Sequence, residues 1–251
     1  MTSGNTSIEK AIATLKRLAE PPYEMTALDI SKELKINRSS VHRIINSFIK
    51  EMMILQNPIT KKYSLGPEAY RIGNSYLLSL NSMDQIRYIV TEVARETNQS
   101  VGYSVLSGDK IVNIFEIENF QPIKIGYSPG TVYPINSGAY GKTIMAFYEP
   151  WEELVDIVKR TYLPQKTPYS ITNPDELLRE YEKIRKQGYA ISDEEGMIGA
   201  MGIGAPIRNS RGQVVGSIAA AVVKGTLDEK DFEFLKLKII EGANKISKLI
   251  P

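Results

Sequence analysis

Residues 27–65 read ALDISKELKINRSSVHRIINSFIKEMMILQNPITKKYSL, and their pattern predicts two helices followed by a hairpin. The first helix is expected over Ala27–Leu34, with Thr26 as its N-cap and Asp29 placed to complete a capping box. The second is expected over Arg38–Met52. Its apolar residues recur at helical spacing and predict a buried stripe made of Val41, Ile44, Ile45, Phe48 and Met52.

Two short extended segments, Ile54–Gln56 and Lys62–Leu65, flank the turn signal Asn57-Pro58 and predict the hairpin. An earlier helix is expected over Ile8–Ala19, because Pro21 and Pro22 end it. Its apolar residues fall on one helical face: Ile8, Ala11, Ile12, Leu15, Leu18 and Ala19. Three helices and a hairpin are the arrangement of a winged helix-turn-helix, whose last helix enters the major groove of DNA.

The polar side of the helix at Arg38–Met52 is suited to contact DNA. Arginine can bind guanine and asparagine can bind adenine, whereas lysines in the wing meet phosphate and fix the register. The candidate DNA-binding residues are Arg38, Ser39, Ser40, His42, Arg43, Asn46, Ser47, Lys61 and Lys62. An ordinary solvated face is the alternative, but such faces mix both signs of charge, and no Asp or Glu occurs from Arg38 to Lys50.

The charge of the chain is distributed unevenly. Residues 1–65 carry ten Lys and Arg against six Asp and Glu, whereas the remaining residues carry 21 against 23. Between Lys35 and Lys62 six basic residues stand against one acidic residue, Glu51. A local basic stretch on a nearly neutral chain indicates a polyanionic partner for that part alone.

Composition excludes several classes of site. The chain has no cysteine and only one histidine, His42, so disulfides, cysteine zinc sites and histidine clusters are not available. We expect no metal, no cofactor and no catalytic residues. The apolar runs are far shorter than the roughly 20 residues of a membrane span, and residues 1–7 lack a signal-peptide pattern. A cytoplasmic protein without a membrane partner is therefore expected.

Downstream of the hairpin the pattern predicts an α+β protein with three parts: a winged helix-turn-helix over residues 1–66, a linker helix over 67–82, and a larger domain over 83–251. In the larger domain short strands, including one at Pro122–Tyr127, are interrupted by helices. This alternation indicates an antiparallel sheet with helices packed on it.

Several strings in the N-terminal part resemble the IclR family of bacterial and archaeal regulators. They are Ser7-Ile8-Glu9-Lys10-Ala11, the run Leu28–Leu34, Ser39-Ser40-Val41-His42-Arg43-Ile44-Ile45, and Tyr63-Ser64-Leu65-Gly66. The Ser-x-Val-His-Arg run in the third helix, followed by Tyr-x-Leu-Gly at the end of the wing, is fairly specific in combination.

The C-terminal part is similar to the same family. Gly130–Ile135 leads into Ser137-Gly138-Ala139-Tyr140-Gly141-Lys142, the run Ile184–Ala190 leads into Asp193-Glu194-Glu195, and Ala205-Pro206-Ile207-Arg208 precedes Gly212–Gly216. The resemblance implies a GAF-like C-terminal domain that binds a small organic effector. It also implies a homodimer, or a dimer of dimers, bound to a palindromic double-stranded DNA operator.

The effector pocket is expected at the helix that begins near Ser137, because a helix N-terminus is suited to a carboxylate; an aromatic compound is the other class considered. The candidate residues are Tyr103, Ser137, Gly138, Ala139, Tyr140, Asp193, Met201, Gly202 and Ser217, with Glu195 on the same loop as Asp193. Many relatives carry an Arg-Cys pair where this chain has Met201-Gly202, which predicts a more apolar or roomier site. The alternative for each residue is an ordinary core or capping role.

An enzyme is the second hypothesis. The segment Asn136–Thr143 ends in Gly141-Lys142-Thr143, as a phosphate-binding loop does. That motif requires a glycine where Asn136 stands, and no acidic residue is placed to hold magnesium. We therefore favour a ligand-controlled DNA-binding regulator.

Overall fold

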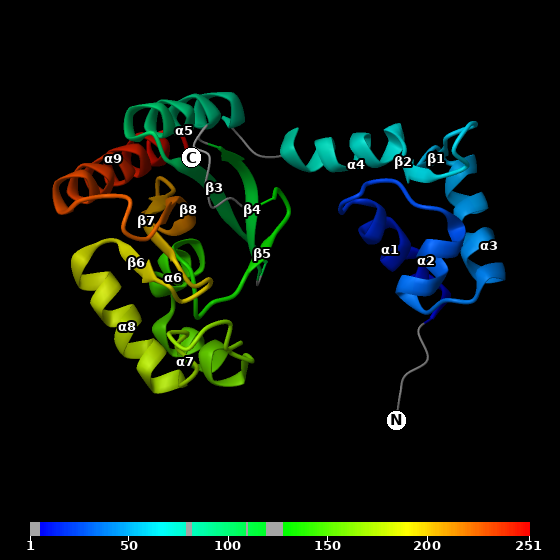
Figure 1. Cartoon of the computed structure of the whole chain (residues 1–251). Coiled ribbons are helices and arrows are strands. Elements are labelled where there is room, and N and C mark those ends of the chain that lie inside the picture. The colour runs from blue at the N-terminus through cyan, green and yellow to red at the C-terminus, as the bar shows by residue number, and fades with distance from the viewer. Residues whose placement is uncertain (1–5, 79–81, 109, 119–127) are drawn as a thin grey trace. The chain divides into compact units, whose positions relative to one another are not determined.

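The computed structural model of the chain describes residues 6–78, 82–108, 110–118 and 128–251. The chain divides into two compact units, Met1–Leu80 and Asn81–Pro251 (Figure 1). Within the described ranges no helix is both long and apolar enough to cross a bilayer.

The first unit is built from three helices, a hairpin and a fourth helix. They are α1 (Ser7–Leu18), α2 (Ala27–Leu34), α3 (Arg38–Lys50), β1 (Ile54–Gln56), β2 (Tyr63–Leu65) and α4 (Pro67–Leu78). The predicted capping box is present, since the N–H of Asp29 donates to the Thr26 hydroxyl and the N–H of Thr26 donates to the Asp29 carboxylate, both at 3.2 Å. The helix-turn-helix and its wing are thus formed as the sequence predicts.

The core of the first unit gathers apolar residues from every element except α4. Its buried members include Leu18, Ile30, Val41, Ile45 and Ile54. These side chains fix the inner side of α3, so the opposite side of the same helix is left for solvent.

Four residues of the two predicted apolar faces are exposed: Ile8, Ile12, Ala19 and Met52. Met52 is 57% exposed, because α3 ends at Lys50 and Met52 has a positive φ of 54°. Ile8 and Ile12 are also exposed, since only the second half of α1 lies on the other helices, with Thr14 and Leu18 buried there.

The second unit is a six-stranded antiparallel sheet in the order β5-β4-β3-β8-β7-β6. Its strands are β3 (Ser100–Ser107), β4 (Lys110–Ile117), β5 (Val132–Tyr133), β6 (Ala190–Asp193), β7 (Ala200–Arg208) and β8 (Val214–Val223). Its helices are α5 (Met83–Thr97), α6 (Ala139–Ala146), α7 (Trp151–Arg160), α8 (Pro174–Gln187) and α9 (Glu229–Ser247). This confirms the predicted antiparallel sheet. The segment expected at Pro122–Tyr127 lies outside the described residues, and β5 was not predicted.

Helices cover both faces of this sheet (Figure 1). Helices α5 and α9 lie side by side on one face, where Gly242 of α9 approaches Ile218. Helix α6 lies on the other face, next to Ala219, and α8 packs against α6. Successive residues of a strand point to opposite faces, which is why Ile218 and Ala219 belong to different layers.

Two glycines allow α6 to lie close to the sheet. A Cβ at Gly102 would stand 2.2 Å from the hydroxyl oxygen of Tyr140, and one at Gly204 would stand 2.5 Å from the Thr143 hydroxyl oxygen. Larger residues would push the helix away, so these glycines let α6 lie against β3 and β7.

Candidate functional site

Helix α3 begins with a local hydrogen-bond arrangement that its sequence specifies. Asn37 is the N-cap, and its side-chain oxygen accepts from the N–H of Ser40 at 2.9 Å and from the hydroxyl of Ser39 at 3.1 Å. The cap fixes where the helix starts and therefore which residues point outward.

The candidate DNA-binding residues lie on the outer side of α3 and in the wing. Six of them are exposed: Arg38, Ser39, Arg43, Asn46, Ser47 and Lys61. The other three are half-buried: Ser40, His42 and Lys62. The structure therefore places seven of the nine predicted residues on α3, which buries Val41 and Ile45 in the core, and the two lysines in the wing.

Three polar side chains of this surface are left for an external partner. Among the described residues, Arg38, Arg43 and Asn46 make no side-chain hydrogen bond or ion pair. The Ser47 hydroxyl instead donates to the carbonyl oxygen of Arg43 at 3.0 Å. A bidentate arginine or asparagine contact to a base contributes about 1–3 kcal/mol of discrimination, so these three side chains have the chemistry for reading DNA.

The wing is a tight hairpin with one lysine available and one engaged. The Asn57 side chain accepts from the N–H groups of Ile59 at 2.9 Å and Thr60 at 3.1 Å, which shapes the turn. Lys61 is exposed, whereas Lys62 pairs with Glu24 at 2.9 Å.

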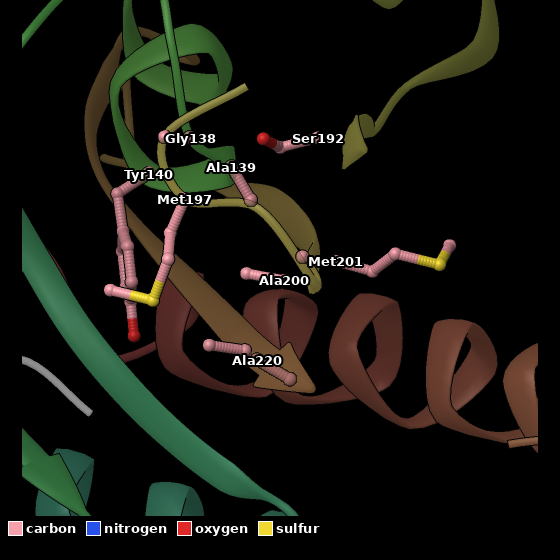
Figure 2. A pocket seen from close by; sticks show the side chains of 11 residues that line it. Gly138, Ala139, Tyr140, Ser192, Met197, Ala200, Met201 and Ala220 are labelled. Carbon is pink, nitrogen blue, oxygen red and sulfur yellow. The ribbon is translucent and has the colours of Figure 1, made fainter. Parts of the chain in front are cut away.

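The pocket of the second unit forms where the start of α6 faces β6, β7 and β8 (Figure 2). Five candidate residues line it: Gly138, Ala139, Tyr140, Met201 and Gly202. Sequence reasoning did not nominate the remaining lining residues, which are Ser192, Gly196, Met197, Ala200, Ala220 and Ala221. Alanines on adjacent strands carry no individual signal, and only their register brings them together.

Four candidate residues do not line the pocket. Tyr103 is buried on the opposite sheet face from Gly102 and contacts Phe115, with ring centroids 5.8 Å apart. Ser137 and Ser217 are buried but do not reach the cavity. Asp193 turns outward and pairs with Lys224 at 2.8 Å.

The pocket is braced by a buried lysine. The Lys142 ammonium lies 2.5 Å from a carboxylate oxygen of Glu195, 3.0 Å from one of Glu180 and 2.7 Å from the carbonyl oxygen of Ile191. It thereby ties α6 to α8, to β6 and to the loop that follows β6. In the sequence, the buried role of Lys142 is indicated only by its position after Gly141 in a helix of mainly apolar residues.

Glu195 continues this network to the start of α6. Its second carboxylate oxygen accepts from the N–H of Gly138 at 3.3 Å. Burial raises the pKa of Glu195, while the Lys142 ammonium and the hydrogen bonds act in the opposite direction. A carboxylate of the chain itself therefore already uses part of the positive end of α6.

The structure contradicts the phosphate-binding alternative. Lys142 is fully buried and fully engaged by its three partners. The Asn136 amide, which stands at the required glycine, is also buried and donates to the carbonyl oxygens of Pro164 and Ile171 at 3.1 and 2.7 Å. The segment is part of the core and cannot wrap a phosphate.

The cavity at the start of α6 has a volume of only about 20 Å³. That volume admits about one water molecule, since one needs roughly 10–15 Å³. Met197 and Met201 both line this space (Figure 2). A ligand larger than water must therefore displace one of the walls.

Comparison with known proteins agrees with this division into two units. The model of the IclR helix-turn-helix domain matches residues 7–58, and that of the bacterial transcriptional regulator IclR C-terminal domain matches residues 74–248. The HTH-type transcriptional regulator KipR of Bacillus subtilis is 27% identical over 250 residues, which is 100% of this chain and 99% of KipR.

Solved structures show the same architecture. The IclR protein of Thermotoga maritima has a TM-score of 0.81 and 29% identity, covering 96% of this chain and 97% of that one. An IclR homologue of Microbacterium hydrocarbonoxydans, solved with 4-hydroxybenzoate, has a TM-score of 0.75 and 18% identity, covering 97% and 99%. With both of its units matched by the family's models, this chain belongs to the IclR family and is a DNA-binding transcriptional regulator with a C-terminal effector-binding domain.

Proposed function

We propose that the outer side of α3 reads the operator and that the wing contacts the DNA backbone. The residues assigned to this role are Arg38, Ser39, Ser40, His42, Arg43, Asn46, Ser47, Lys61 and Lys62. The observation that carries the proposal is that α3 has no acidic residue and that Arg38, Arg43 and Asn46 have no side-chain partner among the described residues. A double-stranded chromosomal target also favours a cytoplasmic location.

The effector is proposed to enter the pocket at the start of α6. Gly138, Ala139 and Tyr140 form the first turn, whose N–H groups lack intrahelical partners and favour a negatively charged group. Apart from Ser192, the other walls are formed by alanine, glycine and methionine, which suits a small, largely apolar body. The related structure that holds 4-hydroxybenzoate supports a carboxylate or aromatic effector.

A homodimer, or a dimer of dimers, is proposed to bind a palindromic operator. Apolar side chains on α1 and α4 support it, since Ile8, Tyr70 and Leu78 are more than 70% exposed, at 72%, 74% and 77%. A second copy would bury them. Two winged helix-turn-helix units bound one helical turn apart would contact half-sites about 34 Å apart. Helix α4 would transmit the effect of effector binding to these units.

A gel-shift experiment with DNA from upstream of the chain's own gene tests the DNA-binding role. The protein is expected to bind that DNA and to bind it more weakly at higher salt, because bound lysines and arginines release counterions. Absence of binding at low salt would contradict the proposal.

The effector role is tested by a thermal-shift screen of small carboxylic acids and aromatic compounds. A bound effector stabilises the folded protein in proportion to the logarithm of its concentration over Kd. If the compounds that stabilise the protein leave its DNA affinity unchanged, they are not effectors.

A further inference from the structure

A second cavity lies in the effector-binding unit, away from the start of α6. It lies between the β4–β5 edge of the sheet and α7, and its volume is about 330 Å³. The pocket assigned to the effector has about 20 Å³. The second cavity therefore accepts a small organic molecule without any rearrangement, since ligand pockets of proteins measure roughly 300–1,000 Å³.

The two cavities are separated by a pair of stacked rings. Tyr133 lines the second cavity and Tyr140 lines the effector pocket. Their ring centroids lie 4.7 Å apart with an angle of 9° between the planes. The stacked rings keep one ligand from extending through both cavities, so the second cavity is a separate site.

The interior of the second cavity is apolar and aromatic. Its walls include the buried Ile111 and Met145, together with Ile157 and the rings of Tyr133 and Tyr148. Such walls favour a flat hydrocarbon body, because aromatic rings bury large areas and stack at low entropic cost.

The rim of the cavity carries an arginine. Arg160 at the end of α7 lines it together with Lys110, and among the described residues Arg160 has no ion-pair partner. The acidic lining residue, Glu153, accepts a hydrogen bond from the Tyr148 hydroxyl at 3.0 Å, which also raises the pKa of Tyr148. Because the Arg160 guanidinium has no ion-pair partner among the described residues, it can bind a negatively charged group at the rim.

We propose that this cavity is a second ligand site, which binds a small aromatic monocarboxylate with its ring between Tyr133 and Ile157 and its carboxylate at Arg160. A planar guanidinium suits a carboxylate, because its two parallel N–H groups can donate to both oxygens. The proposal does not depend on which compound, if any, occupies the pocket at the start of α6.

Methionine methyl groups report on the two cavities separately. Met145 lines the second cavity, whereas Met197 and Met201 line the effector pocket. The chain with both of its units, labelled with ¹³C at its methionine methyl groups, is titrated with each probe to millimolar concentration and followed by NMR. The probes are benzoate, phenylacetate and 3-phenylpropionate, each paired with the corresponding alcohol.

At least one acid is expected to shift the Met145 signal, with the alcohol binding about tenfold more weakly, as expected for loss of one charged hydrogen-bonded contact. Arg160→Gln is expected to weaken binding of the acid by about tenfold. Lys159→Gln, which removes an exposed charge next to it on α7 without touching the cavity, should leave binding unchanged.

Three outcomes would overturn the proposal. One is that no acid shifts the Met145 signal, whether or not Met197 and Met201 respond. Another is that the acid and its alcohol bind equally well. The third is that Arg160→Gln and Lys159→Gln have the same effect on binding.

Discussion

The outer side of α3 and the pocket at the start of α6 both offer polar groups to a ligand, but in opposite states. On α3, Arg38, Arg43 and Asn46 are exposed and have no side-chain partner among the described residues. At the start of α6, Glu195 bonds to Gly138, and Lys142 holds Glu195. The side chains of the first surface are exposed and unpaired, whereas the second is closed and its buried lysine is paired.

This difference has an energetic meaning. An unpaired polar group that is exposed to water costs little folding free energy, because water hydrogen-bonds it. A DNA-reading surface can therefore remain unpaired in the free protein. A buried charge without a partner costs several kcal/mol. The core of the second unit must therefore supply the partners of its own buried charges. Effector binding must then compete with contacts that the protein already makes, and that competition can couple binding to a change of conformation.

The largest expected effect comes from breaking the buried network. Lys142→Met leaves the buried Glu195 without its cation and Glu180 with only the exposed Lys183, and it is expected to destabilise the second unit by about 3–5 kcal/mol. Urea unfolding followed by circular dichroism measures this.

The matched control for that change is Lys183→Met. Lys183 is exposed on α8 and lies 3.7 Å from Glu180, so its loss should cost less than about 1 kcal/mol. Equal unfolding midpoints for the two variants would mean that the buried network of Lys142, Glu180 and Glu195 does not hold the second unit in this folded arrangement.

An intermediate effect is expected from filling the pocket. A Cβ at Gly202 would lie 3.2 Å from both the Cβ of Ala139 and the carbonyl oxygen of Ala220, whereas one at Gly196 would meet nothing within 4 Å. Gly202→Ala should therefore cost roughly 1–3 kcal/mol of stability through overpacking. It should also weaken binding of any effector found in the screen.

Gly196→Ala is the control within the same pocket, because it adds the same methyl group in open space. Its unfolding curve should overlay that of the unchanged protein. If Gly202→Ala behaves in the same way, the pocket is looser than its geometry indicates.

The smallest effect distinguishes the two wing lysines. Lys61 is exposed, whereas Lys62 is paired with Glu24. Lys61→Ala is expected to lower the slope of log Kd against log salt concentration by about 1. Lys62→Ala should lower it less, because Lys62 must leave Glu24 to reach phosphate. A larger change for Lys62 would reverse the roles that the structure gives them.

The sequence predicted the exposed side of α3 better than the lining of the pocket at the start of α6, for a physical reason. Helix spacing, the capping box at Thr26 and the absence of acids on α3 are local, so they can be read along the chain. The ion pair of Lys142 and Glu195 and the approach of Ala139 to Gly202 depend on how distant segments meet. Tyr103 was assigned to the pocket, although the alternation along β3 turns it to the other face.

The most direct test of the reading surface is a fluorescence-anisotropy titration of the upstream DNA and a scrambled duplex with Arg43→Ala. Arg179→Ala serves as the control, because Arg179 is an exposed arginine of the other unit. Arg43→Ala is expected to cost about 1–3 kcal/mol on the upstream DNA and much less on the scrambled duplex, while Arg179→Ala changes neither. Equal affinities of the two variants for the upstream DNA would contradict the assignment of α3 as the DNA-reading helix.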